Sequence, residues 1–198
     1  MKKVSFIIPC YNEEESLPIL YQRLNNVANQ LNNYKCEFIF INDGSKDKTE
    51  EIIENLNKND NRVKLFSFSR NFGHQAAVSC GIHNCESDIA IIIDADLQDP
   101  PEIIPDMIKE YEKNKCPIIY GKRISREGES LFKKLTASIF YRLINLLSEV
   151  QFPVDTGDFR LIDKTVIEAY KSFSENPKYI RGLISWMGFE HKAFEYKR

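Results

Sequence analysis

The pattern of apolar and polar positions predicts strands and helices that alternate along most of the chain. Short apolar runs that stop at polar or turn-forming residues indicate buried strands, and apolar residues three and four positions apart indicate amphipathic helices between them. Strands are predicted at 4–9, 36–42, 63–68, 88–93 and 117–121, and helices at about 17–31, 52–56, 73–83 and 103–111. Such repetition with short connections predicts an α/β fold with a Rossmann-like, mostly parallel sheet and helices on both faces.

The pattern changes after residue 121. A polar, basic segment at 122–129 is predicted to form a loop, and 131–150 is predicted to form a helix whose apolar residues cover more than one face. Such a helix is either buried in a core or lies at a membrane surface, and the pattern leaves both open. A further strand at 159–162, short helices at about 166–173 and 179–187, and a terminal strand at 189–196 are also predicted.

Length and composition indicate one domain of an ordinary globular protein. The 198 residues suit one α/β domain, with 1–121 as one half and 122–198 as the other. A formal charge of −2 argues against a general nucleic-acid-binding surface. The five cysteines include no CxxC pair, which favours reduced thiols. No signal peptide and no apolar run of membrane-spanning length are predicted, so we expect the catalytic face to be cytoplasmic.

Two carboxylates one residue apart are the clearest candidate chemistry. Asp94 and Asp96 follow the strand at 88–93, and residues two apart in extended backbone point to the same side. Ligands bind at the carboxyl ends of strands in open α/β sheets, and carboxylate oxygens favour Mg²⁺ or Mn²⁺. Such an ion commonly completes its shell with substrate phosphates, which predicts a diphosphate substrate. Because Asp-x-Asp is short and common, carboxylates without a metal are the alternative.

Other strands end in residues suited to a nucleotide. Tyr11 can stack on a base and Glu13 can accept hydrogen bonds from base or ribose, although Asn12 and the acidic run after it would also suit a helix start. Asp43 and Arg70 follow the next two strands. Arg70 could contact phosphate or base, whereas Asp43 taken alone is more typical of a turn or cap, because Asp-Gly-Ser is favourable turn chemistry. Neither the G-x-G-x-x-G nor the P-loop pattern occurs, which argues against a dinucleotide-dependent oxidoreductase and against a P-loop protein.

Two further side chains near this rim have mainly structural interpretations. His74 has no companions at zinc-ligand spacing, so we favour a hydrogen-bonding role over metal ligation. Cys10 has no base beside it in the sequence and is interpreted as a buried structural thiol.

Five ordered motifs resemble a known family. They are Phe6-Ile7-Ile8-Pro9-Cys10-Tyr11-Asn12-Glu13, Asn42-Asp43-Gly44-Ser45, Arg70-Asn71-Phe72-Gly73-His74-Gln75-Ala76, Asp94-Ala95-Asp96-Leu97-Gln98-Asp99-Pro100-Pro101-Glu102 and Thr156-Gly157-Asp158-Phe159-Arg160-Leu161. The sequence is similar to family 2 glycosyltransferases of the polyprenyl-phosphate branch, such as bactoprenol glucosyltransferases and dolichol-phosphate mannose synthases. The resemblance covers essentially the whole chain.

This resemblance implies a GT-A fold, a nucleotide-sugar donor, Mg²⁺ or Mn²⁺, and inversion at the anomeric carbon. The donor site would include Pro9, Tyr11, Glu13, Asp43, Arg70, Asp94 and Ala95. Asp96 and Gln98, together with Asp94, would approach the metal, although Gln98 departs from the usual carboxylate ligand. A UDP-sugar is favoured over a GDP-sugar because two motifs are closer to the bacterial members. The oligomeric state, including a homo-oligomer, is left open.

The resemblance also implies a polyprenyl-phosphate acceptor bound at a membrane surface, on the cytoplasmic face of the cell membrane. Its phosphate would be bound by Arg123, Arg126, Lys133, Lys134 and Arg160, whose alternative role is a solvated basic loop and helix edge. Relatives commonly continue into carboxyl-terminal transmembrane helices, so we expect those helices to be missing from this chain. A chain attached to the bilayer only through 131–150 is the alternative.

Asp158, Asp94 and Asp96 are the predicted catalytic residues. By analogy Asp158 is a candidate base, but a phosphate monoester is already ionised near neutral pH and needs no base. We therefore expect Asp158 to orient substrate or Arg160 more than to remove a proton. A family 2 enzyme with a glycan or protein hydroxyl acceptor, which would need that base, and a nucleotide-sugar-binding module without turnover are the alternatives.

Overall fold

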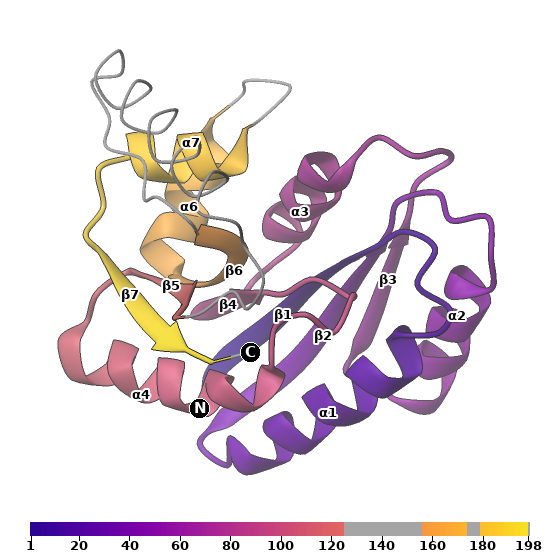
Figure 1. Cartoon of the computed structure of the whole chain (residues 1–198), viewed down its shortest axis with the longest axis horizontal. Coiled ribbons are helices and arrows are strands. Elements are labelled where there is room, and N and C mark those ends of the chain that lie inside the picture. Colours follow the sequence, from indigo (N-terminus) through magenta and orange to yellow (C-terminus); the bar gives the residue numbers. More distant parts are fainter. Residues whose placement is uncertain (125–155, 174–178, 198) are drawn as a thin grey trace.

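A seven-stranded sheet forms the centre of the computed structural model, which describes residues 1–124, 156–173 and 179–197 (Figure 1). The strand order is β3-β2-β1-β4-β6-β5-β7. The strands are β1 (Lys2–Cys10), β2 (Tyr34–Asn42), β3 (Val63–Ser67), β4 (Ile89–Ile92), β5 (Ile118–Arg123), β6 (Thr156–Asp163) and β7 (His191–Tyr196). The first four pair in parallel, so their carboxyl ends share one edge of the sheet.

Strand β6 is antiparallel to both of its neighbours, β4 and β5. Its register pairs Ile92 with Arg160, so continuing the register by two residues places Asp158 opposite Asp94. The amino-terminal part of β6 therefore lies at the edge where the parallel strands end. This reversal brings the motif at 156–161 to the same edge as the motifs that follow β1, β2 and β4.

Helices cover both faces of the sheet because the buried strands point apolar side chains to alternate sides. On one face, Phe6 and Ile8 pack with α1 (Leu17–Gln30), α2 (Thr49–Asn59), η1 (Pro101–Ile103) and α4 (Ile104–Asn114). On the other face, Ile7 and Ile39 pack with α3 (His74–His83), α6 (Lys164–Ser172) and α7 (Ile180–Trp186). Figure 1 shows these two groups of helices on opposite sides of the sheet. The predicted α/β fold class is confirmed.

Several predicted boundaries differ from the structure. Helix α1 begins at Leu17 after Ser16, so the interpretation of Asn12 as a helix cap is wrong. Strand β5 continues to Arg123, because its last residues pair with β7, so this part of the predicted loop is strand. The predicted helix at 131–150 and the remainder of the basic loop at 125–129 lie outside the described residues. Within the described ranges, no helix has the length and hydropathy needed to cross a membrane.

Candidate active site

A cleft of about 340 Å³ opens at the shared carboxyl edge of β1, β2 and β4. This size is within the usual range for small-molecule sites. The predicted site residues that line it are Pro9, Tyr11, Glu13, Asp43, Asp94, Ala95 and Asp96. His74 and Gly73 line it as well. The structure thus brings most of the predicted donor site together, while Arg70 and Gln98 are not among the described residues that line this cleft.

One wall of the cleft is built by two loops that are hydrogen-bonded to each other. The Asn12 backbone N–H donates to Ser45 Oγ at 3.0 Å, and the Lys46 backbone N–H donates to Asn12 Oδ1 at 2.8 Å. Asn12 has a positive φ of 57°, a conformation that asparagine tolerates better than most residues. The neighbouring Tyr11 is 41% exposed, so its ring remains available to a base.

Asp43 connects the end of β2 to the turn that precedes α3. Its buried carboxylate accepts hydrogen bonds from the Phe72 backbone N–H at 2.7 Å and the Gly73 backbone N–H at 2.9 Å. Gly44 has a φ of +66°, and a Cβ there would lie 2.3 Å from the Arg70 backbone carbon. Asp43 therefore fixes a neighbouring loop and not its own turn. Its contact with a nucleoside stays a prediction.

Arg70 is exposed and lies over an aromatic ring of the same turn. Its guanidinium carbon is 4.4 Å from the centre of the Phe72 ring, a cation–π distance. Phe72 is itself 53% exposed. The pair forms a surface beside the cleft, and the predicted contact of Arg70 with base or phosphate stays a prediction.

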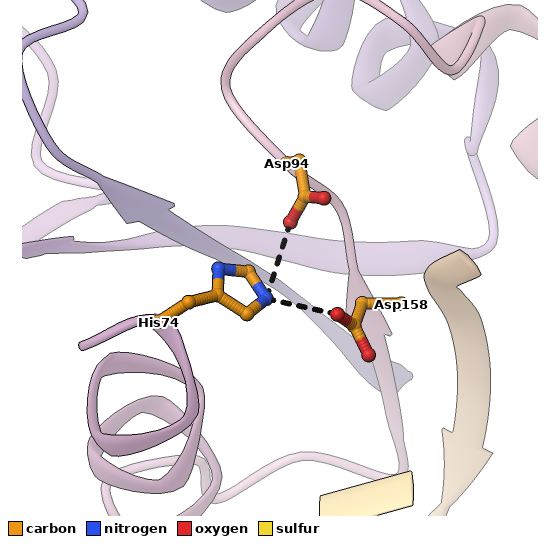
Figure 2. Close-up of side chains that lie close together, drawn as sticks. All are labelled: His74, Asp94 and Asp158. Carbon is orange, nitrogen blue, oxygen red and sulfur yellow. Dashed lines mark ion pairs between the residues drawn. The ribbon is translucent and has the colours of Figure 1, made fainter.

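Asp94 and Asp158 meet at the imidazole of His74, as Figure 2 shows. His74 Nε2 lies 3.1 Å from Asp158 Oδ2 and 3.6 Å from Asp94 Oδ1. Neither contact has full hydrogen-bond geometry, so the ring nitrogen lies close to two carboxylates without a hydrogen bond to either. His74 comes from the first turn of α3, Asp94 follows β4 and Asp158 lies on β6. The favoured hydrogen-bonding role of His74 stays a prediction, because its Nε2 has no hydrogen bond among the described residues.

Arg181 is a site residue that sequence reasoning missed. Its Nε donates to Asp158 Oδ1 at 2.8 Å and its Nη2 donates to Asp158 Oδ2 at 3.0 Å. Arg160 Nη2 lies 3.4 Å from Asp158 Oδ1, and it also donates to the Gly157 carbonyl at 3.1 Å. Arg160 is 5% exposed and is directed to its own strand, so its predicted contact with acceptor phosphate stays a prediction.

The two facing carboxylates have opposite shifts in pKa. Burial raises the pKa of Asp94 to about 6, with further upward contributions from Asp158 and Asp96 that the nearby His74 opposes. Burial would also raise the pKa of Asp158, but His74, Arg181 and Arg160 together hold it below its ordinary value. Contact with the Asp158 carboxylate in turn raises the pKa of His74. Asp158 therefore stays ionised, whereas Asp94 lies where a positive charge would be most favourable.

The residues around Asp94 fit a divalent cation. The Asp94 Oδ1 atom is buried and has no hydrogen-bond partner among the described residues, which leaves it free to coordinate. Asp96 is exposed at the cleft, and its Oδ1 accepts a hydrogen bond from the Gln98 backbone N–H at 2.9 Å. Ligand atoms of His74, Asp94 and Asp158 also lie within 4.8 Å of one another, a second set that shares Asp94. The predicted participation of the Gln98 side chain stays a prediction.

Arg123 has a buried partner in the loop that follows Asp96. Its Nη2 lies 2.8 Å from Asp99 Oδ1, and the Tyr196 hydroxyl donates to the same carboxylate. Asp99 is 4% exposed and Tyr196 is 5% exposed. In this arrangement Arg123 ties the loop to β5 and β7, and its contact with acceptor phosphate stays a prediction.

The remaining residues predicted to bind acceptor phosphate, Arg126, Lys133 and Lys134, lie outside the described residues. Cys10 is buried with its Sγ directed at the Ile8 carbonyl, and burial raises the pKa of its thiol. A thiol with a raised pKa carries little thiolate, which agrees with its interpretation as a structural residue.

Comparison with known proteins identifies the family. Residues 5–171 match the family model described as Glycosyl transferase family 2. The chain belongs to the family 2 glycosyltransferases. An uncharacterized glycosyltransferase YkcC of Bacillus subtilis (strain 168) is 46% identical over 98% of this chain and 59% of its own length. A bactoprenol glucosyl transferase of Shigella phage SfV is 38% identical over 99% of this chain and 63% of its own length. The chain thus spans about 60% of these curated relatives.

Two solved structures have a similar fold. Staphylococcus aureus TarS 1-349 in complex with UDP-GlcNAc has a TM-score of 0.63 at 15% identity, over 100% of this chain and 59% of that one. Glucosyl-3-phosphoglycerate synthase from Mycobacterium tuberculosis, in complex with Mn²⁺, UDP-glucose and phosphoglyceric acid, has a TM-score of 0.60 at 16% identity, over 83% of this chain and 57% of that one. At this level of identity the likeness concerns the fold, and it confirms the GT-A prediction for this family 2 chain.

Proposed function

We propose that this chain forms the catalytic domain of an inverting, metal-dependent glycosyltransferase. It transfers a hexose from a UDP-sugar to a polyprenyl phosphate at the cytoplasmic face of the cell membrane. The observation that carries the proposal is that Asp94 and Asp96 line the same cleft as Tyr11 and Asp43. A nucleotide-sugar needs a surface for its base and carboxylates for the metal that binds its diphosphate. In this cleft Tyr11 would supply the first, and Asp94 and Asp96 would supply the second.

Related proteins support the lipid acceptor and the UDP-sugar donor. The 38% identical Shigella phage protein and a 39% identical Escherichia coli (strain K12) protein are named a bactoprenol glucosyl transferase and a prophage homolog of one. The TarS structure is a complex with UDP-GlcNAc, and the mycobacterial structure is a complex that contains UDP-glucose and Mn²⁺. These relatives and complexes favour a UDP-hexose, a lipid phosphate and Mn²⁺ or Mg²⁺ for the present chain.

The metal would be held by Asp94 and Asp96. His74 and Asp158 lie near enough to Asp94 to add a ligand atom or to keep the Asp94 carboxylate in place. When bound, the metal would neutralise charge on the departing nucleoside diphosphate. The chain's own residues then hold the reactants. Tyr11 and Glu13 would bind the nucleoside, so that the sugar lies near Asp94 in the cleft, with Asp158 on the other side of the His74 imidazole.

Asp158 is suited to orient groups and poorly suited to remove a proton. An effective general base has a pKa near the working pH, whereas His74, Arg181 and Arg160 hold the pKa of Asp158 below its ordinary value. A polyprenyl phosphate supplies an oxygen that is already ionised, which attacks the anomeric carbon while the bond from that carbon to the diphosphate breaks. This acceptor therefore matches a site that lacks a strong base at Asp158.

The alternative enzyme, with a hydroxyl acceptor, would need Asp158 to accept a proton. Because the pKa of Asp158 is held below its ordinary 3.8, the rate of such an enzyme should change little with pH above that value. The rate of transfer to a phosphate should instead rise as the acceptor and Asp94 lose protons, both near about pH 6. A binding module without turnover would show no metal-dependent hydrolysis of the donor. A pH–rate profile and a donor-hydrolysis assay separate these alternatives.

The direct experiment uses the protein expressed from its complete gene, because the chain spans only about 60% of its curated relatives. We would incubate it with a panel of UDP- and GDP-sugars, polyprenyl phosphate, and Mn²⁺ or Mg²⁺, and analyse lipids by mass spectrometry. The expected product is a polyprenyl-phosphate hexose formed from one UDP-sugar. If no combination yields a lipid-linked sugar, the proposed function is wrong.

A further inference from the structure

Gln75 is a motif residue that the proposed reaction does not use directly. It lies in the first turn of α3, next to His74. Its Oε1 accepts a hydrogen bond of 3.0 Å from the Ile180 backbone N–H, across 105 positions of sequence. Ile180 is the first residue of α7, where a backbone N–H has no partner within its own helix. Gln75 therefore links the start of α3 to the start of α7.

This link ends at Ile180, one residue before Arg181, which binds the Asp158 carboxylate. Arg181 follows Ile180 and donates to both oxygens of Asp158, at 2.8 and 3.0 Å. The Ile180 side chain is 2% exposed and belongs to the core cluster that includes Ala77 of α3. A bond to the backbone and a buried side chain thus hold the start of α7 against α3.

The first turn of α3 reaches Asp158 by two routes. His74 contacts the carboxylate directly, with Nε2 3.1 Å from Oδ2. Gln75 reaches it through the start of α7 and the guanidinium of Arg181. We infer that Gln75 is a positioning residue for the transfer reaction, which sets the place of Arg181 and thereby the orientation of the Asp158 carboxylate. The inference rests on the proposed function for its effect on turnover.

If Gln75 had a purely structural role, it would only cap α7 and stabilise the fold, as any helix-capping residue does. The chain offers a matched control for this role in α6, the helix beside α7. Asp163 caps α6 by accepting from the Thr165 and Val166 backbone N–H groups, at 3.0 and 3.2 Å. Loss of either cap should lower stability, whereas only the loss of Gln75 should change catalysis.

The test compares Gln75→Leu, Gln75→Glu and Asp163→Ala. Gln75→Leu removes the acceptor, and we expect kcat to fall between about tenfold and a hundredfold, as for a misplaced catalytic group, with the KM for the donor changed less than twofold. Gln75→Glu keeps an oxygen acceptor at the positive end of α7 and should recover most of the loss. Asp163→Ala should lower the melting temperature and leave kcat within twofold.

A double-mutant cycle with Arg181→Ala tests whether Gln75 acts through Arg181. If it does, Gln75→Leu should lower kcat by less than twofold in the Arg181→Ala background. Equal losses in both backgrounds, equal losses in the Leu and Glu variants, or an unchanged kcat in Gln75→Leu would each overturn the inference.

Hydrogen exchange separates failure of this inference from failure of the proposed function. Gln75→Leu should speed exchange of the Ile180 amide, whatever reaction the protein catalyses, because that amide loses its acceptor. Faster exchange with no lipid product from the parent protein would refute the function and retain the structural link. Unchanged exchange at Ile180 would refute the link itself.

Discussion

Asp94 and Asp158 show how two identical side chains at the same end of adjacent strands acquire different chemistry. Burial raises the pKa of Asp94 to about 6, and its Oδ1 has no hydrogen-bond partner in the part of the chain that the structure describes. Asp158 also contacts His74 but is held in addition by Arg160 and Arg181, which keep its pKa low. One carboxylate is thus available to a cation, and the other is already neutralised by side chains of the chain itself.

Replacement of Asp158 by Asn tests its role. Asp158→Asn removes the charge that orients Arg181 but keeps the size of the side chain, so kcat at saturating acceptor should fall roughly tenfold to a hundredfold and remain measurable. The pH–rate profile should keep its acid limb, since no proton transfer to this residue is lost, and this limb should move to lower pH because Asp94 loses a negative neighbour that raises its pKa. Complete loss of turnover, with normal folding and donor binding, would instead make Asp158 an indispensable base.

Replacement of Asp96 by Asn tests the metal site. Asp96 is exposed at the cleft and its hydrogen bond is local, so Asp96→Asn should leave the melting temperature within about two degrees. It should lower the Mn²⁺-dependent affinity for a UDP-sugar by roughly tenfold to a hundredfold in calorimetric titrations, and excess EDTA should do the same to the parent. Unchanged affinity in both measurements would show that donor binding does not depend on this site.

The apolar pattern predicted the candidate residues that directly follow strands, the family resemblance supplied Asp158, and neither indicated Arg181. Tyr11, Asp43 and Asp94 each follow an apolar run, so their common edge could be inferred from the parallel topology. Arg181 lies in a seven-residue helix that the sequence predicted, but its approach to Asp158 depends on tertiary packing. The pairing of Arg123 with Asp99 could not be predicted either, because a basic residue after a strand gives no sign of its partner.

At the scale of elements, the reversed strand β6 determines the site. Its antiparallel register with β4 places Asp158 opposite Asp94, whereas β1, β2, β3 and β4 pair in parallel. The apolar run at 159–162 predicted a strand but carried no information on direction, since parallel and antiparallel pairing both suit buried apolar residues. The sequence therefore predicted the strands without the pairing that unites the two carboxylates.

The position of the loop after Asp96 is predicted to depend on the hydroxyl of Tyr196. Tyr196→Phe removes the hydroxyl that donates to Asp99 and accepts from Arg123 Nε at 3.2 Å. Leaving a buried carboxylate with one partner fewer should lower the free energy of unfolding by about 1–3 kcal/mol and weaken Mn²⁺ binding severalfold. In the control Tyr34→Phe, which removes an exposed hydrogen bond to Glu112, Mn²⁺ affinity should not change. Equal Mn²⁺ affinity in both variants would contradict the predicted role of the loop anchor.

A buried carboxylate also joins the first three strands at the other end of the sheet. Glu37 of β2 accepts from Ser5 Oγ of β1 at 2.5 Å, and its Oε2 lies 2.9 Å from Lys3 Nζ and 3.0 Å from Lys64 Nζ of β3. Burial would raise the pKa of Glu37, but these partners lower it below the ordinary 4.5. A lowered pKa contributes stability that is present above the ordinary value of 4.5, and this contribution is lost as the pH falls through the folded-state pKa.

The variant Glu37→Gln should therefore be less stable than the parent at pH 7 by about 1–3 kcal/mol, because the two ammonium groups lose their charged partner. Urea unfolding at a series of pH values measures this difference. It should shrink as the pH falls below about 4.5, since protonation gives the parent a similarly uncharged group. A difference that widens in acid would mean that the sign of the shift is wrong.

At the scale of the whole molecule, two helical layers leave one edge of the sheet open for chemistry. The alternation of apolar runs predicted helices on both faces, and Figure 1 shows α1, α2 and α4 on one face with α3, α6 and α7 on the other. The early motifs form the cleft wall and the late motif supplies Asp158, so both halves of the chain are needed for one site. The order of the strands could not be predicted, because it depends on which apolar faces pack together.

Release of UDP tests the central claim most directly. Protein from the complete gene would be supplied with the UDP-sugar and Mn²⁺, and either polyprenyl phosphate or the matching polyprenol would be added. We predict that polyprenyl phosphate stimulates UDP release at least about tenfold, that polyprenol does not, and that Asp96→Asn abolishes the stimulation. Equal stimulation by the alcohol, or none by the phosphate, would contradict transfer to an ionised lipid phosphate.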